Sequence, residues 1–137
     1  MELPHWKTGT PAVLCAAGPH AIPLSTTVRV GGDRVLFALG GEREMLRRLR
    51  TDRRAALCLL GQGLAFTAHG QVRIVGQLSS AATVVAVELS VSRVQDHLRD
   101  GRTQMLDGAR WHWLDDEAAT AEPAIIAELK RLGREKR

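Results

Sequence analysis

The residues best suited to bind a ligand are arginines spaced as on a helix, within segment 42–54. They recur at steps of four, three and four residues: Arg43, Arg47, Arg50 and Arg54. Such steps place side chains on one side of an α-helix, as a stripe. Like charges on a stripe repel each other, and a bound anion would remove that repulsion. Because the planar guanidinium matches phosphate oxygens, the stripe predicts a phosphate site, with a solvated helix face as the alternative.

Two glycines stand directly before this stripe, at Gly40 and Gly41. They allow backbone N–H groups to approach an anion at the start of the helix. A second polar group lies upstream, where Ser25, Thr26 and Thr27 are consecutive. These hydroxyls are either solvent-facing strand residues or a strip that lines the polar edge of a ligand.

The other reactive side chains form no recognisable site. The histidines are scattered without an i, i+4 pair, so we predict no metal site. Of these histidines, His69 is of most interest because it lies within a predicted strand. Cys15 and Cys58 lie in apolar runs, away from any base, and we predict reduced, buried thiols. Trp111 and Trp113 would point to the same side of a strand, as core or dimer packing or as a wall against a flat ring.

These residues are carried by elements that read mainly as β-strands. We expect the first three strands to form a meander, because Gly31, Gly32 and Asp33 give a hairpin signal. Segment 94–98 reads as a helical turn, and Pro123 as the restart of a C-terminal helix. The predicted strands are 11–17, 22–30, 35–39, 55–60, 64–75 with a bulge at Gly70, 83–91 and a short last one at 109–114. The predicted helices cover 42 to about 53 and 115 to about 132. Six or seven strands of this kind predict a closed or partly closed antiparallel barrel.

Length and composition limit the class of protein. At 137 residues we expect one domain over 1–137, with an N-terminal arm at 1–10 and a helical tail at 115–137. The net charge is +4, but with two Phe and no Tyr there is little for bases to stack on, so we predict no nucleic-acid partner. No apolar run is long enough to span a membrane, and the N-terminus has no secretory apolar region. We therefore expect a cytoplasmic protein with no membrane partner.

Taken in order, several segments resemble the pyridoxamine 5'-phosphate oxidase-like, FMN-binding split-barrel family. The resemblance covers most of the chain and is clearest from Thr10 to about Val75. Its specificity comes from the order and spacing of the segments rather than from any one motif. The segments that carry it are 11–17, 18–25, 33–39, 46–52, 55–57 and 66–70, with 94–97 and 110–113 similar to one branch of the family.

The resemblance implies a six- to seven-stranded antiparallel split barrel with one inserted helix and a C-terminal helix. It implies a homodimer with FMN in clefts between the subunits, acting as an oxidoreductase on a small molecule. The deazaflavin F420 is the alternative cofactor. The implied cofactor-binding residues are Leu24, Ser25, Thr26, Thr27, Phe37, Ala38, Leu39, Arg43, Met45, Arg47, Trp111 and Trp113, and no catalytic residue is implied.

The chain departs from the family pattern at the implied phosphate site. Met45 stands where many relatives have a phosphate-binding Lys, and Ala38 where many have Ser or Thr. Two further positions differ: the chain has Arg48 where relatives often have Asn, and Arg53 where they usually have Pro. Loss of a charge-assisted phosphate contact costs about 1.5–3 kcal/mol, which Arg47 could offset. These departures favour a second hypothesis, a non-catalytic flavin or F420 binder.

Overall fold

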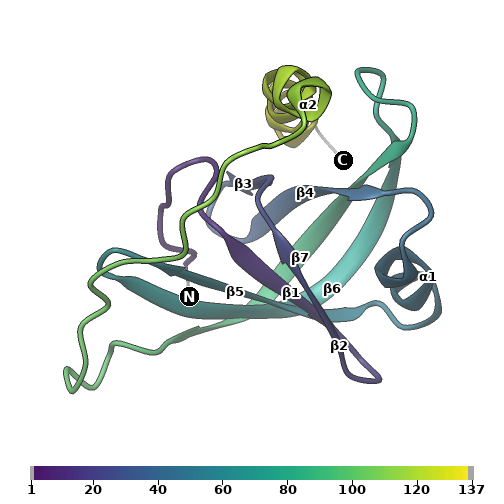
Figure 1. The fold of residues 1–137 in the computed structure, drawn as a ribbon. Coiled ribbons are helices and arrows are strands. Elements are labelled where there is room, and N and C mark those ends of the chain that lie inside the picture. The colour runs from purple at the N-terminus through teal and green to yellow at the C-terminus, as the bar shows by residue number, and fades with distance from the viewer. Residues whose placement is uncertain (1, 136–137) are drawn as a thin grey trace.

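One curled antiparallel sheet forms most of the protein in the computed structural model, which describes residues 2–135 (Figure 1). The sheet has seven strands, in the order β2-β1-β5-β6-β7-β4-β3, and makes a half-barrel accompanied by two helices. The strands are β1 Ala12–Ala16, β2 His20–Leu24, β3 Thr27–Val30, β4 Arg34–Gly40, β5 Arg54–Gly61, β6 Leu64–Gln77 and β7 Val84–Asp96; the helices are α1 Glu44–Thr51 and α2 Asp116–Arg134. The predicted mainly β split barrel is confirmed. Neither helix among the described residues is long and apolar enough to cross a membrane.

The predicted strand 22–30 is two strands, and the predicted meander is wrong. β2 pairs with β1, whereas β3 pairs with β4 at the other end of the strand order. Only Ser25 and Thr26 separate β2 from β3, so the chain passes from one edge of the sheet to the other there. Because two residues span only about 7 Å, the two edges lie close together, and we call this junction the seam. The run of β-branched residues misled the strand prediction, because such residues suit an extended backbone whether or not it belongs to one continuous strand.

β6 and β7 are the longest strands and pair along almost their whole length. The register shifts between His69 and Gly70, which confirms the predicted bulge. A Cβ atom on Gly70 would lie 1.9 Å from the carbonyl oxygen of Ser90, so only glycine fits. The helical turn predicted at 94–98 is wrong: β7 continues to Asp96, opposite Phe66, because strand pairing overrides the local pattern.

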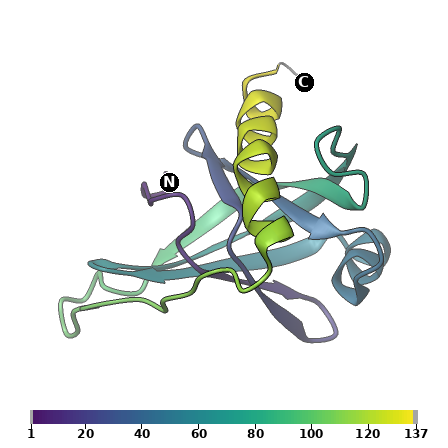
Figure 2. The ribbon, with the colours of Figure 1, turned by 45° about the horizontal axis from the view of Figure 1, so that its top comes forward.

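Apolar side chains fill both sides of the curled sheet. The barrel interior is packed by large buried residues from all parts of the sheet and α1, including Leu14, Phe37, Met45, Leu57 and Phe66. A second cluster lies on the outer face, where α2 covers β3 and β4 (Figures 1 and 2). Its buried members are Val28, Leu36, Leu78, Ala86 and Leu129. α2 is thus part of the folded domain and not a loose tail.

α2 runs without interruption through Pro123, so the predicted restart there is wrong. Asp115 caps it by accepting hydrogen bonds from the backbone N–H groups of Glu117 and Ala118. Pro123 is exposed, and its missing N–H leaves only the Ala119 carbonyl without its helical partner. The end of the predicted tail, at residues 136–137, lies outside the described residues.

A carboxylate holds the C-terminal half of α2 to the β6–β7 loop. Glu128 accepts hydrogen bonds from the backbone N–H groups of Ser79 and Ser80, both at 2.8 Å, and from the Ser80 hydroxyl at 2.7 Å. We call this contact the Glu128 clamp. The Ser80 hydroxyl first, and then the two N–H groups, lower the pKa of Glu128 to about 2, against the effect of burial. Nearby, Arg34 donates to the carbonyl of Gly133 at 3.3 Å, so the end of the helix is fixed as well.

The last predicted strand, 109–114, is absent from the described residues: this segment is extended but unpaired. It passes along the edge of the molecule between β7 and α2 (Figure 1). Trp111 donates through Nε1 to the carbonyl of Gly9 at 2.8 Å, which ties this segment to the N-terminal arm. Residues 2–10 of the N-terminal arm form neither helix nor strand, but Leu3 is buried and Trp6 packs on Phe66 with ring centroids 5.7 Å apart.

Candidate functional site

A cleft of about 680 Å³ opens between the seam, the end of β4 and the N-terminal half of α2. The β6–β7 loop and the link from β4 to α1 lie side by side at the cleft, where the N–H of Gly41 donates to the carbonyl of Thr83 at 2.8 Å. The lining residues are Pro23, Leu24, Ser25, Thr26, Ala38, Gly40, Arg43, Ser80, Ala81, Thr83, Val84, Trp113, Asp115, Glu117, Ala118, Ala121, Glu122 and Ile125. They come from segments far apart in the sequence, so the cleft exists only in the folded chain.

The seam forms one wall. Leu24 ends β2 with its side chain buried, and Ser25 and Thr26 follow, half-buried. Among the described residues neither hydroxyl has a hydrogen-bond partner, so both can bind a ligand. Ala38 lies beside them on β4, and its small side chain leaves the strand backbone accessible to a flat group.

Arg43 provides the positive charge of the cleft. It is the N-cap of α1, with an extended backbone, and its side chain does not cap the helix. Within the part of the chain that the structure describes, its guanidinium has neither a hydrogen bond nor an ion pair, and no other Lys or Arg lines the cleft. The backbone N–H groups of Gly41 and Arg43 are already bonded to the carbonyls of Thr83 and Gly40, so the unpaired guanidinium alone favours a bound anion.

The opposite wall is α2 together with the residues before it. Ala118, Ala121 and Ile125 face the cleft at helical spacing. Trp113 lies at the mouth, where its indole Nε1 donates to a carboxylate oxygen of Glu122. Its ring also meets Trp111 edge to face, with centroids 5.3 Å apart and planes at 90°. Three carboxylates border this wall, from Asp115, Glu117 and Glu122, so this side of the cleft is acidic.

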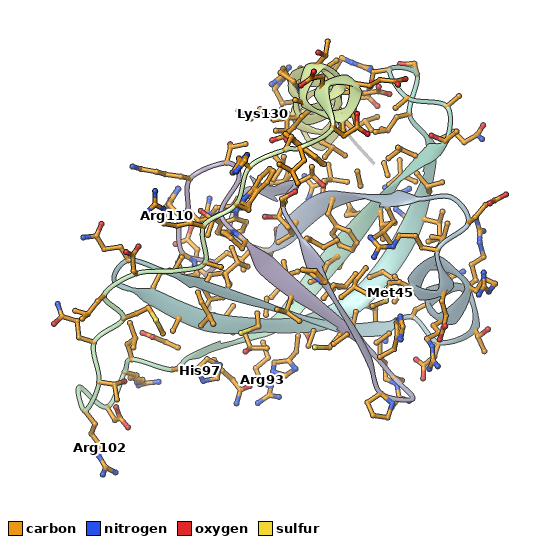
Figure 3. The ribbon with its side chains drawn as sticks, viewed as in Figure 1. Met45, Arg93, His97, Arg102, Arg110 and Lys130 are labelled. Atoms are coloured by element: carbon orange, nitrogen blue, oxygen red, sulfur yellow. The ribbon has the colours of Figure 1, made fainter. Side chains whose placement is uncertain are left out.

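The cleft brings together half of the residues implied by the resemblance: Leu24, Ser25, Thr26, Ala38, Arg43 and Trp113. Four others face the barrel interior: Thr27, Phe37, Leu39 and Met45 are at most 1% exposed. Figure 3 shows Met45 pointing from α1 into the curled sheet. Trp111 contacts Trp113 but does not line the cleft, and Arg47 donates to the carbonyl of Glu42 at 3.1 Å, outside it.

The predicted four-arginine stripe does not form. α1 has only eight residues, so Arg43 precedes it and Arg54 follows it as the first residue of β5. Asp52 ends the helix and accepts from both the backbone N–H and the guanidinium of Arg54, at 2.7–3.1 Å. These hydrogen bonds lower the pKa of Asp52 to about 2. The stripe prediction failed because it extended the helix across this local turn.

Sequence reasoning missed the residues that α2 and the β6–β7 loop contribute to the cleft. For α2 a signal existed, since residues 118, 121 and 125 fall at helical spacing before the buried Leu129. No local signal identifies Ser80, Ala81 or Thr83 as lining residues.

The histidines and cysteines lie away from the cleft. His69 contacts Gln95 at 2.6 Å, and His97 contacts the Thr67 hydroxyl at 2.7 Å, on the outer face of β6 and β7. Cys15 and Cys58 carry free thiols on one face of the β1–β5 pair and are only half-buried, so the predicted burial is wrong. Burial is the main cause that raises the pKa of Cys15, and this thiol is therefore a poor nucleophile.

Comparison with known proteins supports the fold and leaves the family open. No protein-family model matches the sequence, and no curated protein matches it. A candidate pyridoxamine 5'-phosphate oxidase from Listeria innocua superposes with a TM-score of 0.53 and 12% identity, over 64% of this chain and 88% of that one. An F420 reductase superposes with a TM-score of 0.55 and 11% identity, over 64% of this chain and 90% of that one. A FAD-binding protein from Mesorhizobium loti superposes with a TM-score of 0.51 and 12% identity, over 62% of this chain and 81% of that one. The chain therefore has the split-barrel fold of these proteins.

Proposed function

We propose that this chain binds a flavin-type cofactor in the cleft and acts as an oxidoreductase on a small molecule. FMN is the leading cofactor and F420 the alternative. Structural neighbours that bind FAD or act on F420 support a cofactor of this kind. The observation that carries the proposal is the unpaired Arg43 guanidinium at one end of a cleft with a flat, partly apolar wall.

The donor set of the cleft fits such a cofactor. The Arg43 guanidinium would hold a phosphate oxygen. Ser25 and Thr26 would hydrogen-bond the polar edge of the ring, and Leu24 and Ala38 would contact its face. The bound cofactor would supply hydride transfer, while the chain supplies position and electrostatics. Trp113 and α2 would exclude water from the other side of the ring.

One observation favours the second candidate, a non-catalytic binder. Three carboxylates and a single cation line the cleft, so a doubly charged phosphate would meet less compensation here than beside two cations. Met45 does not add a charge, because its side chain is buried in the core. Turnover of a reduced nicotinamide or of F420 by the cofactor-loaded protein would separate an enzyme from a binder.

The experiment that tests the proposal is a titration of the protein with FMN and with F420, followed by visible absorption and fluorescence. We expect saturable binding of one of them, weakened about tenfold to a hundredfold in Arg43→Gln, since one charge-assisted contact is lost. Arg47→Gln is the matched control, because it removes the same charge four residues away but outside the cleft. Absence of binding, or equal effects of the two substitutions, would contradict the proposal.

We also propose a cytoplasmic homodimer. The outer face of β1 and β5 is uncovered in the single chain, and it exposes Val13 by 39% and Leu60 by 42%. Val13 lies opposite Cys58 in the β1–β5 pair, and Leu60 is two residues beyond Cys58, so the side chains of Val13 and Leu60 lie on the same face of the sheet. Burial in a second copy would remove this apolar surface from water. Light scattering should find a dimer that Leu60→Asp dissociates, and a monomeric wild-type chain would contradict the dimer.

A further inference from the structure

One face of α2 meets different surroundings along the length of the helix. In the C-terminal half this face packs on the sheet, where Leu129 is fully buried and Ile125 and Leu132 contact the cluster on the outer face. Ala118 and Ala121 continue the same face at helical spacing, but they line the cleft. The first turns of α2 therefore stand over open space instead of over the sheet.

The anchors that hold α2 to the sheet lie in its C-terminal half. The buried residues of the helix are Glu128, Leu129 and Gly133. Glu128 forms the clamp, and the carbonyl of Gly133 accepts a hydrogen bond from Arg34 at 3.3 Å. A Cβ atom on Gly133 would lie 2.6 Å from a methyl carbon of Val30, so the helix backbone approaches β3 closely there. Residues 116–127 are half-buried or exposed throughout, so displacing them would uncover little apolar surface.

Pro123 lies between the two halves. Because proline has no N–H, the carbonyl of Ala119 lacks its helical hydrogen bond. A gap of this kind in the hydrogen-bond ladder is a frequent point of bending in helices. The proline side chain is exposed, so packing on the sheet does not account for its presence. The helix is thus weakest where its anchored half meets its unanchored half.

The N-terminal half is held by contacts with the segment that precedes the helix (Figure 2). The Trp113 indole donates to a carboxylate oxygen of Glu122, and Asp115 caps the first turn. Trp113 also packs on Trp111, whose Nε1 donates to the carbonyl of Gly9. Trp111 and Trp113 are 39% and 40% exposed, so water competes for these contacts. They can therefore open while the Glu128 clamp stays closed.

We propose that residues 113–122 form a lid, which turns about Pro123 and closes on a ligand in the cleft. The lid brings the Trp113 ring and the small side chains of Ala118 and Ala121 onto the ligand face that points away from the seam. Closure removes that face from water and slows release of the ligand. The motion itself is a property of the free protein, whereas its role in retaining a ligand rests on the proposed function.

The first test is NMR relaxation dispersion on the free protein. We expect exchange on the microsecond to millisecond timescale at amides 117–122 and at the Trp113 indole N–H, and flat profiles at 126–133. Pro123→Ala restores the missing N–H and should lower the open population at least about threefold. Flat profiles in both halves, or the same exchange process along the whole helix, would overturn the lid.

A pair of variants tests the contact that keeps the lid closed. Glu122→Ala removes the acceptor of the Trp113 indole and should raise the open population at least about threefold, since a hydrogen bond to a charged group is lost. Asp116→Ala is the matched control, because it removes the same charge from an exposed lid position that does not line the cleft. Equal effects of the two substitutions would overturn the role of this contact in the lid.

The second test adds FMN or F420. Binding of either should abolish the exchange of the lid amides, and Glu122→Ala should speed cofactor release in stopped-flow fluorescence at least about threefold relative to Asp116→Ala. A cofactor that binds and leaves the lid exchange unchanged would overturn closure on the ligand. If neither cofactor binds, the proposed function fails, and the exchange in the free protein still decides whether the lid exists.

Discussion

The Glu128 clamp allows a quantitative prediction for Glu128→Gln. The substitution keeps the size of the side chain but leaves only one acceptor oxygen. The hydrogen bonds from the N–H and hydroxyl of Ser80 lose their charge, and the Ser79 N–H loses its acceptor because an NH2 group replaces one carboxylate oxygen. Since each lost charge costs about 1 kcal/mol and an unpaired buried N–H about 1–3 kcal/mol, the variant should lose at least about 3 kcal/mol of unfolding free energy. The same hydrogen bonds lower the pKa of Glu128 to about 2, so the stabilisation should depend on pH.

The pH dependence has a definite sign. The folded pKa lies below the unfolded one, so the stabilisation is complete above pH 4.5 and disappears as the pH falls towards 2. The difference in unfolding free energy between the wild type and Glu128→Gln should therefore shrink as the pH falls from 4.5 towards 2. Urea unfolding followed by circular dichroism, at several pH values between 7 and 2, measures both free energies.

Glu135→Gln is the matched control on the same helix. Glu135 is exposed, and within residues 2–135 its carboxylate pairs with Arg131 alone, at 3.2 Å, so its substitution should cost less than about 0.5 kcal/mol. A cost for Glu128→Gln no larger than that of the control would refute the reasoning. So would an unchanged difference between wild type and Glu128→Gln from pH 7 to pH 2.

Three further outcomes are expected. In an NMR titration the carboxyl of Asp52 should show a pKa of about 2, and Arg54→Gln should return it towards 3.8; a value near 3.8 in the wild type would contradict the turn described above. Gly70→Ala should cost at least about 3 kcal/mol in urea unfolding or prevent folding, because the new Cβ would lie 1.9 Å from the carbonyl oxygen of Ser90; a wild-type midpoint would show that the bulge can relax. Alkylation of Cys15 by iodoacetamide should be slower at pH 7.5 than that of an unstructured thiol, and faster on urea unfolding, since burial raises its pKa; equal rates would indicate an exposed thiolate.

Much of the fold could be predicted because it depends on local patterns. Alternating apolar residues indicated most strands, and Gly70 indicated the bulge. Pairing across the sheet could not be read in the same way. Ser25 and Thr26 look like the middle of a strand, and only the meeting of the two sheet edges makes them a link.

The candidate site was predicted in part for the same reason. Arg43 stood out by its position after two glycines, and the structure places it in the cleft. Arg54 looked equivalent, but Asp52 ends the helix and binds it.

The seam links ligand binding to the folding of the whole chain. β2 and β3 are joined by two residues but pair at opposite ends of the strand order, so the wall of the cleft is complete only when the whole sheet has formed. A partly folded chain therefore has no cleft to offer. Any ligand held by Ser25 and Thr26 binds the native state alone, and its binding energy adds to global stability by mass action. The melting temperature would then rise with ligand concentration, even for a ligand that contacts only one corner of the barrel.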